Sequence, residues 1–377
     1  MKQLHVLFLA SWYPSRILKT NGDFIQRHAE AVSLLHKVSV IHVKTDPNLK
    51  EKIEISDKKI NGIRTIIAYI KPSNNPITKW LRFYNAYKLL LKTVTKFDVI
   101  HVNKFYPGGL FAYFNKKKHQ IPYIITEHHT LYHEPYCQKI GFIELFLSKI
   151  IIKNASYVCP VSDNLGKAMQ KLGLKGNYTK IPNVVDTKRF TVSKPIKNDV
   201  FTILHVSSMA KVKNITGLLH VVKKLESKLE NFKFYIIGGN AEDYIKNAKA
   251  LNINLANLVF KNQVSHEKIT SYFQQADVFV LFSDVENLPC VILESFSCGT
   301  PVISTDVGGI SEFFPENYGL LIEAKNETEL LDAILKIKHD FNVETPEKMH
   351  QYVVNRFSEK QIANEFSRYY YKAINNE

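Results

Sequence analysis

The stretch Asp284–Phe314 reads DVENLPCVILESFSCGTPVISTDVGGISEFF and sets two carboxylates, Glu286 and Glu294, eight residues apart across a predicted helix start. The apolar residues before it predict a buried strand. Pro289 suits the first turn of a helix, because the N–H that proline lacks has no partner there. Gly299 and the proline after Thr300 end that helix. The helix therefore begins at the carboxyl edge of a parallel sheet, where backbone N–H groups attract phosphate.

The length and composition of the chain fit two globular domains. With 377 residues, 45% of them hydrophobic, it can fill two cores. It has no run of 18 apolar residues, so we expect no membrane-spanning helix. Leu4–Ala10 is followed by Trp12 and Tyr13 where a signal peptide would have small residues, so it is interpreted as a first buried strand. The four cysteines form no C-x-x-C motif and are expected to be free thiols in a reducing cytoplasm.

Positive charge is concentrated in the first half of the chain. Residues 1–200 hold 32 Lys and Arg against 13 Asp and Glu, a net charge of +19, whereas residues 201–377 hold 18 against 22, or −4. This asymmetry predicts an anionic partner for the first half. No zinc-finger spacing, RNP-type aromatic motif or Gly-x-x-Gly loop indicates nucleic acid. A membrane surface or a pyrophosphate-bearing acceptor fits better.

Short apolar runs alternate with helical patterns, as is typical of parallel βαβ units. In the first half, strands are expected at Leu4–Ala10, Val38–Val43, Val99–Val102, Tyr123–Thr126 and Tyr157–Val161, with helices such as Phe24–Leu35 between them. The pattern restarts with strands at Thr202–Val206, Lys233–Ile237, Leu258–Phe260, Val278–Phe282 and Pro301–Ser304. The polar segment Val192–Asp199 is the predicted linker. The expected domains are therefore 1–194 on the acceptor side and 195–356 for nucleotide-sugar binding, with 357–377 as a final helix.

The motif around the two glutamates resembles the signature of the retaining GT-B glycosyltransferases of family 4: E-x7-E, then a Gly-x-Pro-Val strand start and a Gly-Gly loop. This resemblance implies an α/β GT-B fold, in which two Rossmann-like, doubly wound domains face each other across a cleft. It gives Glu286 contact with the donor sugar and Glu294 contact with the nucleotide ribose. The residues between them, Asn287, Leu288 and Pro289, then bind the donor. A lone Glu outside such a motif would more often be a solvated side chain.

The family pattern continues after the first strand of the second domain, where Gly-Arg is followed by Lys-Asn. Lys213 and the asparagine after it match that Lys-Asn, and the resemblance gives Lys213 a grip on the nucleotide diphosphate. Ser208 stands where arginine is expected, and it offers one weak donor in place of a charged fork. Lys211 could supply the missing charge, although a solvated lysine is as good an interpretation.

Two further matches to the family pattern indicate where the nucleotide would bind. Gly238, in a Gly-Gly pair after the strand that ends at Ile237, resembles the small-residue wall beside the nucleotide. Val264 lies in the segment before the predicted helix His266–Gln275 that matches the base-binding loop, and is expected to pack on the base.

In the first half the resemblance singles out Gly22 and His128. Gly22 precedes a predicted helix and is the residue expected to approach the donor phosphate, although a turn glycine before any helix is the alternative. His128 follows the strand Tyr123–Thr126 and is expected to contact the donor sugar, whereas a histidine at a strand end is often just a satisfied polar group. We expect no metal site, because His128, His129 and His133 lack other ligands at suitable spacing.

The predicted function is therefore retaining transfer of a hexose-type sugar, from a UDP- or GDP-linked donor to a glycan or lipid-linked acceptor, in cell-surface polysaccharide synthesis. No cofactor is expected. Glu286, His128 and Lys213 are the expected catalytic residues. A dehydrogenase is disfavoured, because no G-x-G-x-x-G follows the first strand. A sugar-nucleotide epimerase or a non-catalytic sugar-nucleotide-binding protein of the same fold stays open.

Two helices carry the remaining expectations. Phe357–Ile374 resembles the family's last helix, which returns to the first domain; packing on the second domain alone is the alternative. Lys79–Phe97 is amphipathic: Trp80, Tyr84, Tyr87, Leu91 and Val94 share one stripe, and Arg82, Lys88, Lys92 and Lys96 flank it. A helix packed on the core explains this pattern as well as a membrane-surface helix does. The charge of the first half favours a cytoplasmic protein that is peripheral on the inner face of the cytoplasmic membrane.

Overall fold

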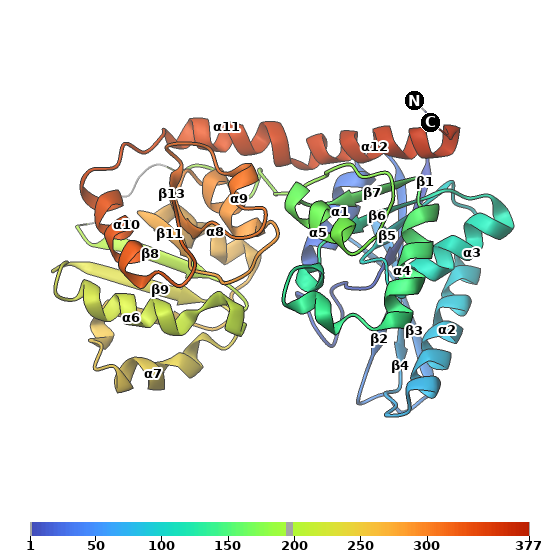
Figure 1. Cartoon of the computed structure of the whole chain (residues 1–377), viewed down its shortest axis with the longest axis horizontal. Coiled ribbons are helices and arrows are strands. Elements are labelled where there is room, and N and C mark those ends of the chain that lie inside the picture. The colour runs from blue at the N-terminus through green and yellow to red at the C-terminus, as the bar shows by residue number, and fades with distance from the viewer. Residues whose placement is uncertain (1, 194–198, 377) are drawn as a thin grey trace. The chain divides into compact units, whose positions relative to one another are not determined.

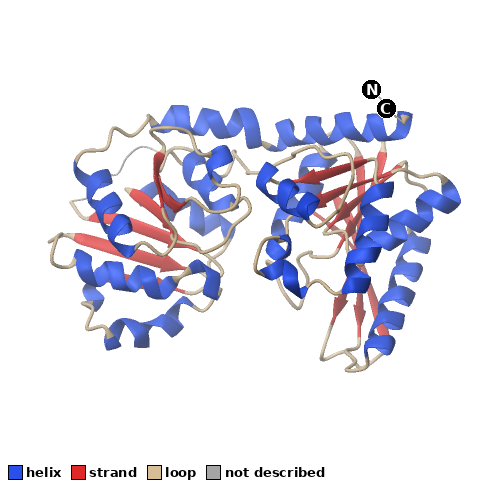
Figure 2. Cartoon of the chain, in the orientation of Figure 1, coloured by secondary structure: helices blue, strands red, loops and turns tan. Residues whose placement is uncertain are grey.

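The computed structural model describes residues 2–193 and 199–376, which form two compact α/β units (Figures 1 and 2). The first unit contains the described residues up to Val184 together with those from Glu359 onward, and the second runs from Val185 to Ser358. Nearly all strands of the two sheets are parallel, as the expected GT-B class of fold requires. Among the described residues, no helix combines the length and the apolar character needed to cross a membrane.

The boundary between the units lies earlier than the residue 194 expected from the sequence. Val185 donates its N–H to the Phe357 carbonyl oxygen at 2.9 Å. The Phe190 ring packs on Phe273, with centroids 6.0 Å apart, and the Phe190 carbonyl accepts from the Ser297 hydroxyl. The polar composition around 192–199 gave no sign of these contacts, which join residues 185–193 to the second unit. Residues 194–198 of the predicted linker lie outside the described residues.

The first unit is built on a seven-stranded sheet in the order β3-β4-β2-β1-β5-β6-β7. All neighbours are parallel except β3 and β4. The strands are β1 (His5–Ala10), β2 (Lys37–Thr45), β3 (Ile53–Ile60), β4 (Ile63–Ile70), β5 (Val99–Asn103), β6 (Tyr123–Glu127) and β7 (Tyr157–Pro160). The helices are α1 (Asp23–Ser33), α2 (Pro76–Thr93), α3 (Gly109–His119), α4 (Phe142–Asn154), α5 (Asp163–Lys171) and α12 (Glu359–Asn375), with short 3-10 turns at Thr130–Tyr132 and Tyr136–Lys139.

The last helix of the chain completes the core of the first unit. Ile362, Phe366 and Tyr370 of α12 are fully buried and join one apolar cluster with α1 and with alternate residues of β1, such as Val6 and Phe8. A buried histidine of β5 is bonded to this helix: His101 Nδ1 lies 2.7 Å from the Tyr370 hydroxyl. The period of 3.6 residues places these apolar side chains on one face of α12, which is why the helix binds here.

The second unit holds a six-stranded, fully parallel sheet in the order β10-β9-β8-β11-β12-β13. Its strands are β8 (Phe201–Val206), β9 (Phe232–Ile237), β10 (Leu258–Lys261), β11 (Val278–Leu281), β12 (Val302–Thr305) and β13 (Gly319–Ile322). Its helices are α6 (Ile215–Leu225), α7 (Ile245–Ala250), α8 (His266–Gln275), α9 (Cys290–Ser297), α10 (Glu327–His339) and α11 (Pro346–Phe357), and 3-10 turns include η3 (Lys211–Lys213), η4 (Ala241–Tyr244), Leu255–Asn257 and Ser311–Phe313. Near-continuous apolar strands suit a sheet that helices cover on both faces.

Candidate active site

In both sheets the strand order reverses beside the first strand of the unit. In the second unit β8 lies between β9 and β11, and in the first unit β1 lies between β2 and β5. In doubly wound sheets, ligands bind outside the carboxyl ends of the strands at such a reversal. The residues that follow β8 and β11 are therefore the candidate site residues of the second unit, and those that follow β1 and β5 are the candidate site residues of the first unit.

The structure pairs two predicted catalytic residues of the second unit. Lys213 ends η3, shortly after β8, and Glu286 follows β11; the Lys213 ammonium forms an ion pair with Glu286 Oε1. The two segments are also joined through the backbone, because the Asp284 N–H donates to the Val212 carbonyl at 2.7 Å. Side-chain exposure is 18% for the lysine and 9% for the glutamate. A cation and a carboxylate are therefore held together in a largely dry environment at the strand reversal.

Close backbone packing fixes the loop that carries Glu286. Gly308 has a φ of +64°, and a Cβ there would lie 1.8 Å from the Glu286 carbonyl oxygen. Gly309 donates its N–H to the Asn287 carbonyl at 3.0 Å. Asn287 and Leu288, both predicted to bind the donor, are buried in this loop. Gly308, the first residue of the Gly-Gly pair, thus has a steric role: only glycine allows this approach.

The helix after this loop carries the second glutamate of the motif. α9 begins at Cys290, and Pro289 at its N-cap makes no side-chain capping bond. Glu294 lies on this helix and is 4% exposed. Carboxylate oxygens accept hydrogen bonds, and the hydroxyls of a ribose can donate them. The position of Glu294 therefore suits the role expected for it, which stays a prediction.

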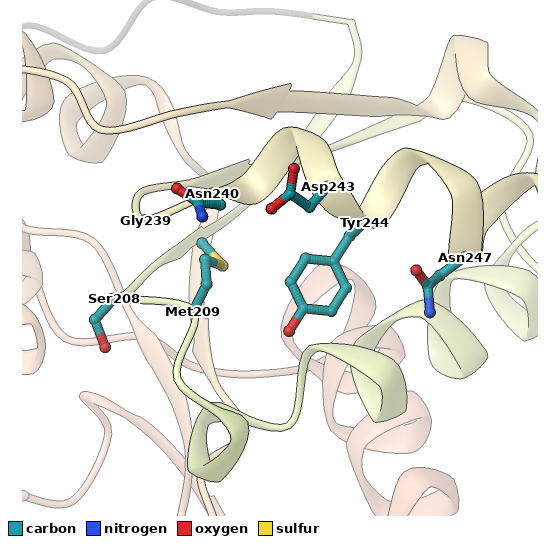
Figure 3. Close-up of a pocket in the computed structure, with 7 residues that line it drawn as sticks. All are labelled: Ser208, Met209, Gly239, Asn240, Asp243, Tyr244 and Asn247. Carbon is teal, nitrogen blue, oxygen red and sulfur yellow. The ribbon is translucent and has the colours of Figure 1, made fainter.

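A cavity of about 370 Å³ lies beside the predicted nucleotide wall (Figure 3). Its lining comes from the loop after β8, the loop after β9 and the start of the helical segment that leads into α7: Ser208, Met209, Gly239, Asn240, Asp243, Tyr244 and Asn247. Sequence reasoning singled out Ser208 and the Gly-Gly pair but missed the polar residues of η4 and α7. The only signal for them was their position directly after that pair. Gly238 closes the wall: it has a φ of +121°, and a Cβ there would lie 2.0 Å from the Ser207 carbonyl oxygen.

The other predicted donor residues of the second unit lie on nearby loops. Lys211 is exposed at the start of η3, the turn that ends in the paired Lys213. Val264 is half-buried in the loop before α8. That loop is tied to η4 because the Glu242 N–H donates to Asn262 Oδ1 at 3.2 Å. The loop that carries Val264 is therefore joined to the segment that lines the cavity.

In the first unit, Gly22 packs directly on the loop after β1. It is the N-cap of α1, with a φ of +78°, and a Cβ there would lie 2.6 Å from the Trp12 carbonyl carbon. A side chain would therefore displace the chain at the carboxyl end of β1. Phe24 links Gly22 to the predicted histidine, because its ring lies 6.2 Å from the Trp12 ring and 4.6 Å from the His128 ring.

His128 follows β6 and lies among aromatic rings. Its ring centroid is 5.4 Å from that of His28. Burial lowers its pKa well below the usual value, the nearby His28 and His101 lower it further, and the Asn183 side chain acts in the opposite direction. The imidazole is therefore uncharged near neutral pH. An uncharged ring can accept or donate one hydrogen bond but cannot neutralise a phosphate.

The same edge of the sheet holds polar residues that sequence reasoning did not select. Glu127 is fully buried, and its oxygens accept the backbone N–H groups of His128, His129 and Phe105. Burial raises its pKa, although these N–H groups oppose the change. Lys104, which follows β5, is half-buried, and the Glu127 carboxylate acts to raise its pKa. In the described ranges, no three His, Cys, Asp or Glu side chains gather in a way that could hold a metal ion.

Comparison with known proteins identifies the family of this chain. The family described as Glycosyl transferases group 1 matches residues 186–356, and Glycosyltransferase Family 4 matches residues 25–189. A Bacillus subtilis protein assigned by its name to teichuronic acid biosynthesis, the glycosyltransferase TuaC, is 26% identical over 89% of this chain and 90% of its own. The alpha-monoglucosyldiacylglycerol synthase of Acholeplasma laidlawii is 24% identical over 78% of this chain and 83% of its own.

Solved structures agree on the fold. A sucrose-phosphate synthase from Thermosynechococcus elongatus superposes with a TM-score of 0.78 at 19% identity, covering 100% of both chains. Anabaena HepE, solved in complex with UDP-glucose, superposes with a TM-score of 0.73 at 15% identity over 97% of this chain and 99% of its own. The two family matches together span both units and include every predicted site residue except Gly22. The chain is thus an enzyme that belongs to the group 1 glycosyltransferases of the GT-B fold.

Proposed function

We propose that this glycosyltransferase transfers a hexose from a UDP- or GDP-linked sugar to a glycan or lipid-linked acceptor, with retention of anomeric configuration, in the synthesis of a cell-surface polysaccharide. The single observation that carries the proposal is the Lys213–Glu286 ion pair at the strand reversal of the second unit. The names of TuaC and of the monoglucosyldiacylglycerol synthase favour a polysaccharide or lipid-linked acceptor.

The reaction breaks the bond between the anomeric carbon and the diphosphate. Positive charge develops on the sugar, and negative charge develops on the leaving diphosphate. In this proposal Lys213 neutralises the diphosphate, and the backbone N–H groups at the start of α9 add to its field. Glu286 is assigned to the sugar. The two side chains neutralise each other before the donor binds, so neither charge is buried unpaired.

Retention does not require a protein nucleophile in this scheme. The acceptor hydroxyl attacks the face of the sugar that the diphosphate leaves, and the departing diphosphate takes up the hydroxyl proton. His128 is assigned to the sugar, in the uncharged form that its environment imposes. An uncharged imidazole can hold a sugar hydroxyl without repelling the positive charge that develops on the ring. Proton NMR of the product's anomeric linkage tests retention directly.

Nucleotide release tests the proposed function. Purified chain is screened for thermal stabilisation by UDP, GDP and their sugars; a ligand at a hundred times its Kd adds about 2.7 kcal/mol of stability. The stabilising donor is then assayed for nucleotide release with and without acceptor. Lys213→Ala should abolish release, whereas Lys233→Ala, which removes an exposed lysine of the same unit, should not. Equal rates in both variants would contradict the assignment.

The same assay separates the alternatives. A sugar-nucleotide epimerase releases nucleotide or epimerised sugar with no acceptor present. A non-catalytic binding protein is stabilised by the donor but releases nothing. Only a transferase releases nucleotide in proportion to the glycosylated acceptor.

We further propose that the first unit binds the anionic inner leaflet of the cytoplasmic membrane to reach a lipid-linked acceptor. Large apolar side chains are exposed at the starts of two helices: Ile77 (71%) and Trp80 (52%) on α2, and Phe142 (86%), Ile143 (71%) and Phe146 (55%) on α4. Water-exposed Phe and Trp side chains gain free energy by entering a lipid interface.

The structure refines the amphipathic pattern of α2. Tyr87 and Val94 are buried, so the carboxyl-terminal half of the predicted stripe packs on the core, and only the amino-terminal part is exposed. The helix ends at Thr93. Arg82, predicted as part of the basic flank, donates to the carbonyl oxygens of Lys71 and Pro72. The free basic flank is therefore smaller than the sequence pattern indicated.

Co-sedimentation with liposomes tests the membrane proposal. Exposed Lys88, Lys92 and Lys96 are changed together to Glu, and Arg82 is left in place because of its structural bonds. Each Lys near an anionic surface contributes about 1 kcal/mol, so the loss of three positive charges should weaken binding by about two orders of magnitude, and the three added negative charges should weaken it further. Phe142→Ser should weaken binding without changing its salt dependence. Equal binding of the wild type to neutral and anionic vesicles would refute the proposal.

A further inference from the structure

Lys104 occupies the strand reversal of the first sheet. β5 pairs with β1 up to Asn103, and Lys104 is the next residue. Its backbone is bonded on both sides: its N–H donates to the Thr126 carbonyl at 3.0 Å, and its carbonyl accepts from the Ser11 hydroxyl at 2.8 Å. The chain at Lys104 is therefore fixed by the residues at the ends of β1 and β6.

This fixed position is conformationally costly. Lys104 has a φ of +56°, in the left-handed region that residues with a Cβ rarely adopt. Strain of this kind tends to be kept where a side chain must point in a given direction. The direction here brings the ammonium over the Trp12 indole, 4.3 Å from the ring centroid.

The Lys104 ammonium is poorly hydrated, and in the part of the chain that the structure describes it has no carboxylate within ion-pair distance. Burial lowers its pKa, while Glu127 and Glu144 act in the opposite direction from longer range. Glu127 is occupied by three backbone N–H groups. A desolvated cation without a partner is unfavourable, in contrast to Lys213, which has Glu286.

A second polar group beside the same indole also lacks a partner. The His129 ring lies 4.9 Å from the Trp12 ring, and its Nδ1 is buried without a hydrogen-bond partner among the described residues. Burial lowers the His129 pKa to about 4, and the nearby Lys104 contributes to that change. At neutral pH this imidazole is uncharged, so it can donate or accept a hydrogen bond without adding charge.

We propose that Lys104, together with Trp12 and His129, binds an anionic group of the acceptor, a carboxylate or a phosphate on a sugar. A ligand anion gives the ammonium its missing partner, one of its oxygens satisfies His129, and the indole packs on the sugar ring. The first half of the chain, with a net charge of +19, attracts such an acceptor from a distance. The inference rests on the proposed function, because it assigns the acceptor side of the same enzyme.

The test observes Lys104 itself and does not need the natural acceptor. Lysines of the full chain are ¹³C-dimethylated, and the Lys104 signal is identified by its loss in Lys104→Met. Lys104→Arg also removes the signal, and serves if the methionine variant does not fold. Glucuronate, glucose 6-phosphate and glucose are added at constant ionic strength, at concentrations on the order of 50 mM, above the millimolar range of a weak contact. The exposed Lys171, assigned in the same way, is the matched control.

The Lys104 signal should move with one or both anions and not with glucose, and the pKa of Lys104 should rise by about one unit in the responding complex. A response to glucuronate alone identifies an acidic sugar, and a response to glucose 6-phosphate identifies a phosphorylated one. A Lys104 signal that moves with neither anion, or no more than the Lys171 signal does, would overturn the proposal. Nucleotide release by the unmodified wild type tests the proposed function separately, since that readout depends on the donor side.

Discussion

Replacing Glu286 with glutamine removes a charge and keeps the shape of the side chain. Glu286 is 7% exposed, so its field is weakly screened. Two unit charges about 4 Å apart interact by about 4 kcal/mol at an effective dielectric constant of 20. If the sugar carries roughly half a unit charge in the transition state, the loss is about 2 kcal/mol, or roughly 30-fold in kcat. The donor KM should change little, because the bound donor sugar is uncharged.

The effect on folding should be small. The side-chain amide of the Glu286→Gln variant would still accept a hydrogen bond from Lys213, so the loss in unfolding free energy should be about 1 kcal/mol. The assay follows nucleotide release under saturating donor, with thermal unfolding measured in parallel. Glu316→Gln removes an exposed carboxylate of the same unit and is the matched control. A correctly folded Glu286→Gln with wild-type kcat would refute the electrostatic role.

Four other outcomes are expected. Glu294→Ala should raise the donor KM roughly 10- to 150-fold with little change in kcat, because a charge-assisted hydrogen bond to the nucleotide is worth about 1.5–3 kcal/mol; an unchanged KM in kinetic assays would contradict this. Lys211→Ala should lose activity nearly as heavily as Lys213→Ala if it replaces the arginine that Ser208 displaces, and full activity would leave Lys213 as the charged grip. Burial lowers the pKa of His28 to about 4, so the unfolded chain binds the extra proton below pH 6.5. His28 alone should therefore lower the stability by about 2 kcal/mol between pH 7 and pH 5, and urea unfolding should show a fall that is smaller by this amount in a His28→Gln variant. Deleting residues 357–377 should abolish soluble expression, and a soluble, fully active truncation would argue against a structural role for α12.

Much of the fold was predictable because buried parallel strands are continuous apolar runs. β6 was expected at Tyr123–Thr126 and is found at Tyr123–Glu127, and α8 has the predicted bounds. The β3–β4 hairpin was missed because β3 is an edge strand whose residues are largely exposed and polar. Its Asn61-Gly62 turn was the available signal.

The candidate site was predictable only where a motif carried it. Glu286 and Glu294 were found by their spacing, but the partner of Glu286 lies 73 residues away, and only the fold brings Lys213 to it. Lys104 has no local signature, since its burial, its strained backbone and its missing partner all result from tertiary contacts. The lining of the cavity at η4 and α7 follows from the same kind of long-range packing.

Because α12 belongs to the first unit, the first unit can complete its folding only after the second unit has been synthesised. During synthesis the residues before Val184 emerge first, yet Ile362, Phe366 and Tyr370, which fill their core, emerge after the whole of the second unit. The second unit is one uninterrupted segment and can fold as it leaves the ribosome, whereas the first must wait with part of its apolar surface uncovered. Chaperones would be needed during that interval. A premature stop codon that removes α12 would leave the first unit without part of its core.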